Sequence, residues 1–188
     1  MRFLLWTLVA LLLAPFAQAA EPPIWKIDQA KSSLTFQVKV NDQTVSGRFP
    51  GIGAFIRFDP ANLAQSSVKA TIDATGIKTF NATRDSMLLK PAWFNVVDFP
   101  QAIFQSTAFS SPGPNKYLCK GKLSLKGIER EINLPFTLIV RGNQADMVGQ
   151  TTLKRLDFKV GDGPDYASDT PVALSVNVMV KIHAAWAR

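Results

Sequence analysis

Apolar and polar residues alternate with a period of two along most of this chain. Near the C-terminus, apolar side chains occupy every second position from Val172 to Ile182, and polar ones such as Ser175 and Lys181 lie between them. A second run has five alternating apolar positions, from 132 to 140. Because successive side chains of a strand point to opposite faces, this pattern predicts long strands with one buried face.

Shorter runs of the same kind predict the remaining strands. They cover residues 34–40, 45–49, 54–58, 68–72, 102–109, 117–125 and 149–153. Tight turns are predicted at Asn41-Asp42, Lys126-Gly127 and Arg141-Gly142-Asn143, where turn-forming residues interrupt the alternation. Residues 110–116, which hold two prolines and a glycine, predict a loop. Pro135 within the 132–140 run favours an edge strand or a bulge.

The segment Thr79–Thr107 is the part of the chain that least resembles a strand. Residues from Asn81 to about Leu89 favour a short helix, since Ala, Met, Leu and Arg are good helix formers and no proline precedes Pro91. Two large rings, Trp93 and Phe94, follow the helix. The segment therefore predicts a helical plug that covers the mouth or a seam of a barrel.

The predicted elements define the fold class. At least eight strands joined mostly by short turns indicate an antiparallel all-β fold. One helical insert, with no helix repeated between strands, argues against a parallel α/β sheet. Strands with one buried face suit both a β-sandwich and an up-and-down barrel, and the pattern leaves both open.

Residues 1–19 have the features of a signal peptide. Arg2 supplies the positive start, residues 3–13 form the apolar run, and Ala17-Gln18-Ala19 fits the cleavage pattern of small residues. The apolar run is short for a membrane span. We therefore expect an exported chain, in a periplasmic setting, with one mature domain over residues 20–188.

Charge and cysteine content exclude some classes of function. The formal net charge is +7, and it becomes +6 when Arg2, the one charged side chain of residues 1–19, is removed. The basic residues are scattered, which argues against nucleic-acid binding and permits weak attraction to an anionic membrane surface. The single cysteine, Cys119, can form no internal disulfide, and its alternation with Leu123 predicts a small buried side chain.

Catalytic chemistry finds little support in the sequence. His183 is the only histidine, so a histidine-based zinc site lacks ligands, and the chain has no Gly-x-Ser-x-Gly nucleophile motif. The acidic residues Asp157, Asp162, Asp165 and Asp169 do not have the spacing of a calcium loop and indicate a solvated loop. We expect no enzyme activity, no metal and no catalytic residue.

A series of short pieces runs in order along nearly the whole mature chain. They are Trp25-x-Ile27-Asp28, Ser33-x-x-Phe36-x-Val38, Val45-x-Gly47-x-Phe49, Phe58-Asp59, Thr79…Arg84-Asp85-x-x-Leu88, Trp93-Phe94-Asn95…Phe99-Pro100-x-Ala102-x-Phe104-x-Ser106-Thr107, Tyr117…Gly121-x-Leu123-x-Leu125-Lys126-Gly127 and Arg155-x-Asp157-Phe158-x-Val160-Gly161. In this order and spacing they resemble the YceI-like family of bacterial periplasmic polyisoprenoid-binding proteins. Trp93 replaces a residue that is often acidic in the family, and Tyr166 lies where a Trp is common. The first change resembles the variety found beside cytochrome b561-type membrane proteins.

The resemblance implies a lipocalin-like, antiparallel, eight-stranded β-barrel with a short helical insert. Its interior would be an apolar tunnel that binds, carries or sequesters a long-chain isoprenoid, such as a quinone, or a related amphiphile. No cofactor other than this bound lipid is expected. The residues expected to contact the lipid are Phe36, Val38, Phe49, Phe58, Met87, Leu88, Trp93, Phe94, Phe99, Phe104, Leu123, Phe136, Leu138, Phe158, Tyr166, Val176 and Val178.

Two alternatives remain open at this point. Arg84 and Asp85 either hold the helical insert to the barrel rim or bring Arg84 to a polar head group, and as neighbours in a helix they are expected to have separate partners. The chain could also be an interaction module that docks on a membrane redox protein, such as a cytochrome, through an exposed patch of Trp93 and Phe94. Exposed strand edges could pair two copies into a homodimer.

Overall fold

The computed structural model describes residues 21–187, so the predicted signal peptide lies outside the described residues. The strands are β1 (Ile24–Ile27), β2 (Ser33–Val40), β3 (Gln43–Phe49), β4 (Ile52–Arg57), β5 (Ser67–Asp73), β6 (Gln101–Gly113), β7 (Lys116–Leu125), β8 (Ile128–Arg141), β9 (Gln144–Lys154) and β10 (Val172–Trp186). Between them lie the helix α1 (Ala82–Leu88) and two single helical turns, η1 (Leu63–Gln65) and η2 (Arg155–Phe158).

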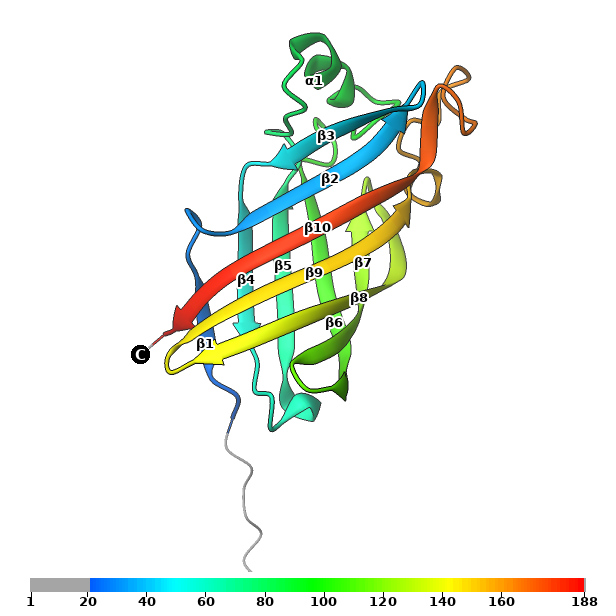
Figure 1. The fold of residues 1–188 in the computed structure, drawn as a ribbon. Coiled ribbons are helices and arrows are strands. Elements are labelled where there is room, and N and C mark those ends of the chain that lie inside the picture. Colours follow the sequence, from blue (N-terminus) through cyan, green and yellow to red (C-terminus); the bar gives the residue numbers. More distant parts are fainter. Residues whose placement is uncertain (1–20, 188) are drawn as a thin grey trace, which may run out of the picture.

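The 15-residue strand β10 closes the sheet into a barrel (Figure 1). One of its edges pairs with β9, and the other pairs first with β2 and then, from Ala184 to Trp186, with β1. Since β1 also pairs with β4, eight strands form a ring in the order β1-β4-β5-β6-β7-β8-β9-β10. The predicted antiparallel eight-stranded barrel is confirmed, and a barrel rather than a sandwich is the form that the alternating strands take.

The hairpin of β2 and β3 widens the barrel at the end away from β1. Beyond its ladder with β2, β3 meets the rest of the sheet through one bridge, in which Arg48 and Lys78 exchange backbone hydrogen bonds of 2.8 and 2.9 Å. Ring closure is therefore tight at the end that holds β1 and looser at the end that holds the β2–β3 hairpin.

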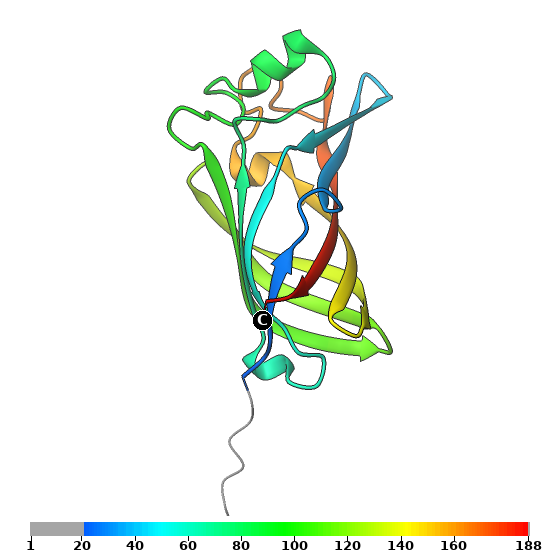
Figure 2. The same ribbon diagram turned by 90° about the vertical axis from the view of Figure 1, so that its left-hand side faces the viewer.

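The predicted helix is confirmed as α1, and its start has a clear cause. The Oδ1 atom of Asn81 accepts a hydrogen bond of 2.9 Å from the backbone N–H of Arg84, which caps the first turn. The segment that carries α1 runs from β5 to β6 and lies across one end of the barrel, beside the loop that joins η2 to β10 (Figure 2). We call residues 74–100 the lid.

The predicted loop at 110–116 is wrong over most of its length. β6 continues to Gly113 and β7 begins at Lys116, which leaves Pro114 and Asn115 as the turn. The ladder shifts register between Ser110 and Gly113, so the interruption accommodates a proline whose missing N–H would break a regular ladder. Prolines and a glycine thus mark an irregular hairpin here, and not a loop.

Pro135 lies where one ladder of β8 stops. β8 pairs with β7 from Ile128 to Thr137, but its pairing with β9 begins at Phe136. On the side of β9, Pro135 is therefore at an edge, as predicted, and neither ladder shifts register there. Its missing N–H costs the sheet little because the β8–β9 ladder does not extend to this residue.

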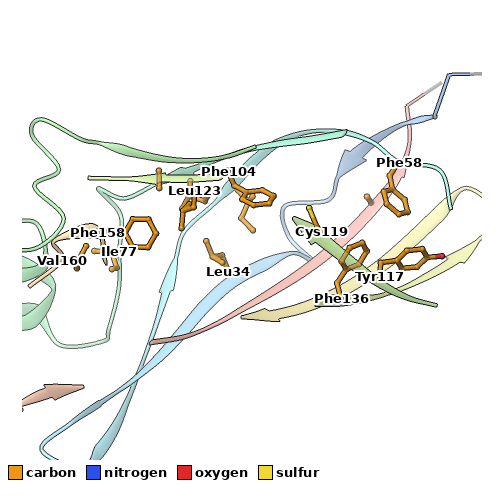
Figure 3. Packing of buried hydrophobic residues seen from close by; sticks show 14 of the residues in the cluster. Leu34, Phe58, Ile77, Phe104, Tyr117, Cys119, Leu123, Phe136, Phe158 and Val160 are labelled. Carbon is orange, nitrogen blue, oxygen red and sulfur yellow. The ribbon is translucent and has the colours of Figure 1, made fainter. Parts of the chain in front are cut away.

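The barrel interior holds the hydrophobic core, which changes in character along the axis (Figure 3). At one end lie Phe58, Tyr117 and Phe136, and at the other lie Ile77 of the lid together with Phe158 and Val160. Within residues 21–187, the search for a helix long and apolar enough to cross a membrane finds none.

The two faces of β8 provide a test of this architecture. Leu138 points inward and is 7% exposed, whereas its neighbour Ile139 points outward and is 42% exposed. We predict that Leu138→Asp lowers the free energy of unfolding by roughly 3 kcal/mol or more, because an unpaired polar group would be buried. Ile139→Asp should change it by less than about 0.5 kcal/mol.

Urea unfolding of the two variants measures both values. Equal losses from Leu138→Asp and Ile139→Asp would show that the faces of β8 are assigned incorrectly.

Candidate functional site: an apolar cavity in the barrel

A cavity of about 240 Å³ lies along the barrel axis. Residues from all eight ring strands line it, together with Leu34 of β2, Phe49 of β3 and Phe94 of the lid. On β10 alone the lining runs from Val178 to Ala184, which is roughly 20 Å at about 3.3 Å per residue. The cavity is thus long and narrow, a shape that suits a slender ligand.

The cavity wall offers almost no polar group to a ligand. Thr151 is the one lining residue with a hydroxyl, and its Oγ1 donates a hydrogen bond of 2.9 Å to the backbone carbonyl of Asn133. Cys119 also lines the cavity, and burial raises the pKa of its thiol to about 12, so the thiol stays protonated at neutral pH. This agrees with the predicted small buried side chain, and the wall can bind only apolar groups.

An aromatic cluster closes the cavity at the end that holds β1. The ring of Phe58 lies 5.2 Å from that of Phe109, 5.5 Å from that of Tyr117 and 6.0 Å from that of Phe136. Trp25 adds a fourth wall residue there, and its Nε1–H donates a hydrogen bond of 2.8 Å to the carbonyl of Phe58. These edge-to-face contacts fill the barrel and seal this end.

A second aromatic row lies at the lid end. The ring of Phe49 lies 5.7 Å from that of Phe36 and 5.9 Å from that of Phe94. The Phe36 ring covers Gly47, where an added Cβ would come within 2.2 Å of the ring. Gly47 is therefore needed for this packing. Phe49 and Phe94 line the cavity, so this row forms its wall at the lid end.

Trp93 attaches the lid to the loop between η2 and β10. Its ring is 6% exposed and lies 5.1 Å from that of Tyr166. Next to it, the carbonyl of Ala92 accepts a hydrogen bond of 2.8 Å from the N–H of Gly161. The two positions at which the sequence departs from the family pattern, Trp93 and Tyr166, therefore meet each other.

A buried arginine, Arg155, holds this loop in place. Its guanidinium donates hydrogen bonds to six backbone carbonyls, and Arg155 as a whole is 4% exposed. The acceptors are the carbonyl oxygens of Val160, Gly161, Tyr166, Ser168, Val172 and Ala173. Burial lowers the pKa of Arg155, and the charge of Asp169 opposes that shift. The carbonyl dipoles take the place of a carboxylate partner.

Sequence reasoning missed the role of Arg155. Its side chain follows strand β9 directly and lies within a piece shared with the family, but an arginine at the end of a strand is usually solvated. The six acceptors come from residues 160–173, and nothing in their order along the chain identifies a single donor. A fork with five N–H donors is the side chain best suited to collect them.

Arg84 and Asp85 share one partner, which corrects the expectation of separate partners. Both hydrogen bond to Thr79. The guanidinium of Arg84 donates to the Oγ1 and the carbonyl oxygen of Thr79, at 2.8 and 3.0 Å. The carboxylate of Asp85 accepts hydrogen bonds from the backbone N–H and the hydroxyl of Thr79, at 2.7 and 2.5 Å. These contacts hold α1 to the chain that enters it. Thr79 is itself 5% exposed.

The structure divides the residues predicted to contact lipid into two groups. The first group lines the cavity and comprises Phe49, Phe58, Phe94, Phe104, Leu123, Phe136, Leu138 and Val178. The second group lies outside the lining and comprises Phe36, Val38, Met87, Leu88, Trp93, Phe99, Phe158, Tyr166 and Val176. Met87, Leu88, Trp93 and Phe99 belong to the lid itself, and Phe99 lies against the turn at Gly127.

The sequence analysis also missed the small residues of the wall. Ala54 and Ala70 line the cavity, and the space in front of their methyl groups is part of it. Their positions on the alternating face of β4 and β5 were visible in the sequence. The residues predicted to contact lipid were all larger than alanine, but a cavity needs small side chains as much as large ones.

His183 lies outside the cavity lining. Its Nδ1 is 2.7 Å from Oδ1 of Asp146, which also forms a salt bridge of 3.1 Å with Arg141. The hydrogen bond with His183 is the main cause that lowers the pKa of Asp146. Among the described residues, no group of three or more potential ligands is placed to hold a metal ion.

The geometry defines a class of protein: a closed eight-stranded barrel with a ligand-sized apolar interior, the arrangement of lipocalin-like binding proteins. The model of the YceI-like domain matches residues 25–185, and the chain belongs to this family. The family and the fold indicate a binding protein.

Curated relatives have similar sequences over most of their length. A UPF0312 protein of Vibrio campbellii is 27% identical over 153 residues, which cover 78% of this chain and 81% of the relative. A UPF0312 protein of Shewanella denitrificans is 28% identical over 168 residues, which cover 85% and 88%.

Solved structures show the same fold. BcnA of Burkholderia cenocepacia superposes with a TM-score of 0.81 at 31% identity, over 85% of this chain and 100% of that one. The YCEI protein of Campylobacter jejuni has a TM-score of 0.70 at 23% identity, over 78% and 87%. A polyisoprenoid binding domain from Saccharophagus degradans has a TM-score of 0.70 at 13% identity, over 88% and 99%.

The hydrogen bonds to Asp85 predict a dependence of stability on pH. The Thr79 hydroxyl, as the main cause, holds the pKa of Asp85 below its ordinary value of 3.8. The stability that the carboxylate contributes is therefore fully present above that value and is lost as the pH falls through the lower pKa of the folded state.

We predict that the stability gap between the wild type and Asp85→Asn is constant above about pH 5 and shrinks below it. Urea unfolding between pH 6 and pH 2.5 measures this gap, with the exposed Ser86→Ala as a control whose gap stays flat. A gap for Asp85→Asn that widens in acid would contradict the assignment.

The contacts of Arg155 predict a large loss on substitution. Arg155→Met should lower the free energy of unfolding by about 2 kcal/mol or more, because several buried carbonyls lose a charged donor. Arg155→Lys should recover little, since an ammonium has three donors and no planar fork. The control variant Lys154→Met, at the exposed neighbouring residue, should change the free energy of unfolding by less than about 0.5 kcal/mol.

Hydrogen exchange adds a local measurement to these stabilities. In Arg155→Met the amides of residues 159–171 should exchange faster, while those of β6 and β7 should keep their protection. Full rescue by Arg155→Lys would mean that charge alone, and not the fork of donors, holds the loop.

Proposed function

We propose that this protein binds the apolar tail of a long-chain isoprenoid lipid, or a related amphiphile, and carries or sequesters it in the periplasm. One observation carries the proposal: a long cavity inside the barrel whose single hydroxyl-bearing wall residue, Thr151, already donates to a backbone carbonyl. Such a wall gains free energy from apolar area, at about 25 cal/mol per Å² buried, and offers no group that could act on a substrate.

The comparisons support the same class of ligand. The solved domain from Saccharophagus degradans is described as polyisoprenoid binding, and it shares this fold. A quinone would be a suitable cargo because its prenyl tail fits an apolar wall. A membrane cytochrome, the partner expected from the sequence, would then be a donor or acceptor of that quinone.

Burial of Trp93 favours the carrier over the docking module. The docking hypothesis needs Trp93 and Phe94 as an exposed patch, but Trp93 is 6% exposed and Phe94 lines the cavity. Both side chains face the interior, where they serve the lid and the cavity wall.

Native mass spectrometry of protein exported to the periplasm, followed by solvent extraction, tests the proposal. We expect one prenyl or acyl lipid per chain in the wild type. Ala70→Phe places a ring in the cavity and should weaken binding of that lipid at least tenfold, about 1.4 kcal/mol.

A matched control lies on the neighbouring strand. Ile103 is 38% exposed on the outer face of β6, so Ile103→Phe adds similar bulk outside the barrel and should leave lipid occupancy unchanged. Wild-type protein that is empty, and stays empty when challenged with quinones and fatty acids, would refute the proposal. Equal occupancy of Ala70→Phe and the wild type would refute this cavity as the site.

A further inference from the structure

Phe80, the residue before the cap of α1, exposes its ring to solvent. The side chain is 75% exposed, and only Val97 exceeds it among the exposed large apolar residues of the described chain. An apolar residue just before the cap often packs against the fourth residue of the helix, but here that residue is Asp85, whose carboxylate turns to Thr79. The helix therefore gives the Phe80 ring no apolar partner.

The backbone of Phe80 is held in an unfavourable conformation. Its φ is +61°, in the left-handed region that glycine and asparagine adopt readily and bulky residues avoid. Both the strained backbone and the exposed ring are unfavourable for folding, so stability alone would favour a different residue at this position. A strained residue that displays an aromatic ring to solvent points to a binding role.

A cation lies beside the ring. The guanidinium carbon of Arg48 lies 5.6 Å from the centre of the Phe80 ring. Arg48 and Lys78 exchange backbone hydrogen bonds across an antiparallel bridge, so their exposed side chains leave the same face of the sheet. An aromatic ring with two adjacent cations matches the interface of an anionic bilayer, where rings and basic side chains both lie at the level of the head groups.

Val97 supplies a second apolar point on the same lid. It is 89% exposed and lies between α1 and β6. Exposed Lys90 follows α1, and the acidic neighbour of Val97, Asp98, accepts a hydrogen bond of 2.9 Å from the side chain of Asn95. The lid holds three basic residues and two acidic ones, and the carboxylate of Asp85 is engaged by Thr79. The lid by itself therefore has a formal charge of +1, on a chain that carries +6 without residues 1–19.

We propose that the lid end of the barrel docks on an anionic lipid bilayer through Phe80 and Val97, with Arg48, Lys78 and Lys90 against the head groups. The lid also contributes Phe94 to the cavity wall, so docking would bring this end of the cavity to the membrane. The idea that docking serves lipid transfer rests on the proposed function, whereas the docking surface itself is argued from the exposed residues alone.

Vesicle flotation tests the proposal. The probes are vesicles of phosphatidylcholine alone and vesicles with 30% phosphatidylglycerol, with exported protein whose N-terminus is confirmed by intact mass. We expect binding to the anionic vesicles at low salt and its loss at about 0.5 M salt, where charges are strongly screened. Removal of one apolar point should weaken binding about tenfold, and Lys78→Gln should weaken it about fivefold.

The variants are chosen so that folding is preserved. Phe80→Asn suits the left-handed backbone, and Val97→Ser changes an exposed loop residue. The control is Phe55→Thr on β4: Phe55 is 51% exposed, and Arg57 lies 5.6 Å from its ring centre. It has the same ring and cation chemistry on the barrel wall, away from the lid, and its loss should leave flotation unchanged.

The results separate docking from lipid carriage. No binding to anionic vesicles, unchanged binding of the double variant Phe80→Asn/Val97→Ser, or an equal loss from Phe55→Thr would each overturn the docking proposal. Capture of a membrane protein without vesicle binding would do the same. Lipid occupancy is measured on the same samples by native mass spectrometry, so an empty chain that floats refutes the carrier, and a loaded chain that does not float refutes the docking surface.

Discussion

Closure of the barrel through β10 is the constraint on which the rest of the structure depends. One edge of β10 serves β9, while the other is shared by β2 and β1 in turn. Because two different strands pair with this edge of β10, the barrel is tight where β1 completes the ring and wide where the β2–β3 hairpin stands apart. The end with β1 can be filled by rings from neighbouring strands, and the wide end requires a separate cover.

That cover is held by polar contacts, although the interior that it covers is apolar. Arg155 donates hydrogen bonds to carbonyls of the loop before β10 and of the first two residues of β10. Thr79 forms hydrogen bonds with Arg84 and Asp85 of α1. These contacts lie outside the cavity wall, so the barrel can keep an unobstructed apolar interior without leaving its irregular segments unsupported. Recognition inside such a wall is governed by shape and apolar area, and any selection of a polar head group must occur at the lid.

The lid brings together two segments far apart in the sequence. Ala92 and Trp93 meet Gly161 and Tyr166, so the part of the chain after β5 and the part before β10 form one cover. Its inner side contributes Phe94 to the cavity, and its outer side displays Phe80 and Val97. The same short element therefore faces both the site and the surroundings from which a ligand would arrive.

The helix and nine of the ten strands could be read from the sequence, because helix propensity and alternation of side chains are local properties, whereas β1 was not among them. Local signals failed where pairing was decisive: the prolines at 112 and 114 suggested a loop, but the register of β6 and β7 accommodates a strand. Periodicity placed Phe104 and Leu138 on the inner face, yet sequence pattern could not separate residues that touch the cavity from buried residues outside its lining, such as Leu88 and Phe158. Three features could be seen only in the folded structure: barrel closure, the hydrogen bonds of Arg155, and the partner Thr79 that Arg84 and Asp85 share. Each of them joins groups whose proximity depends on how distant segments or adjacent side chains are oriented in space.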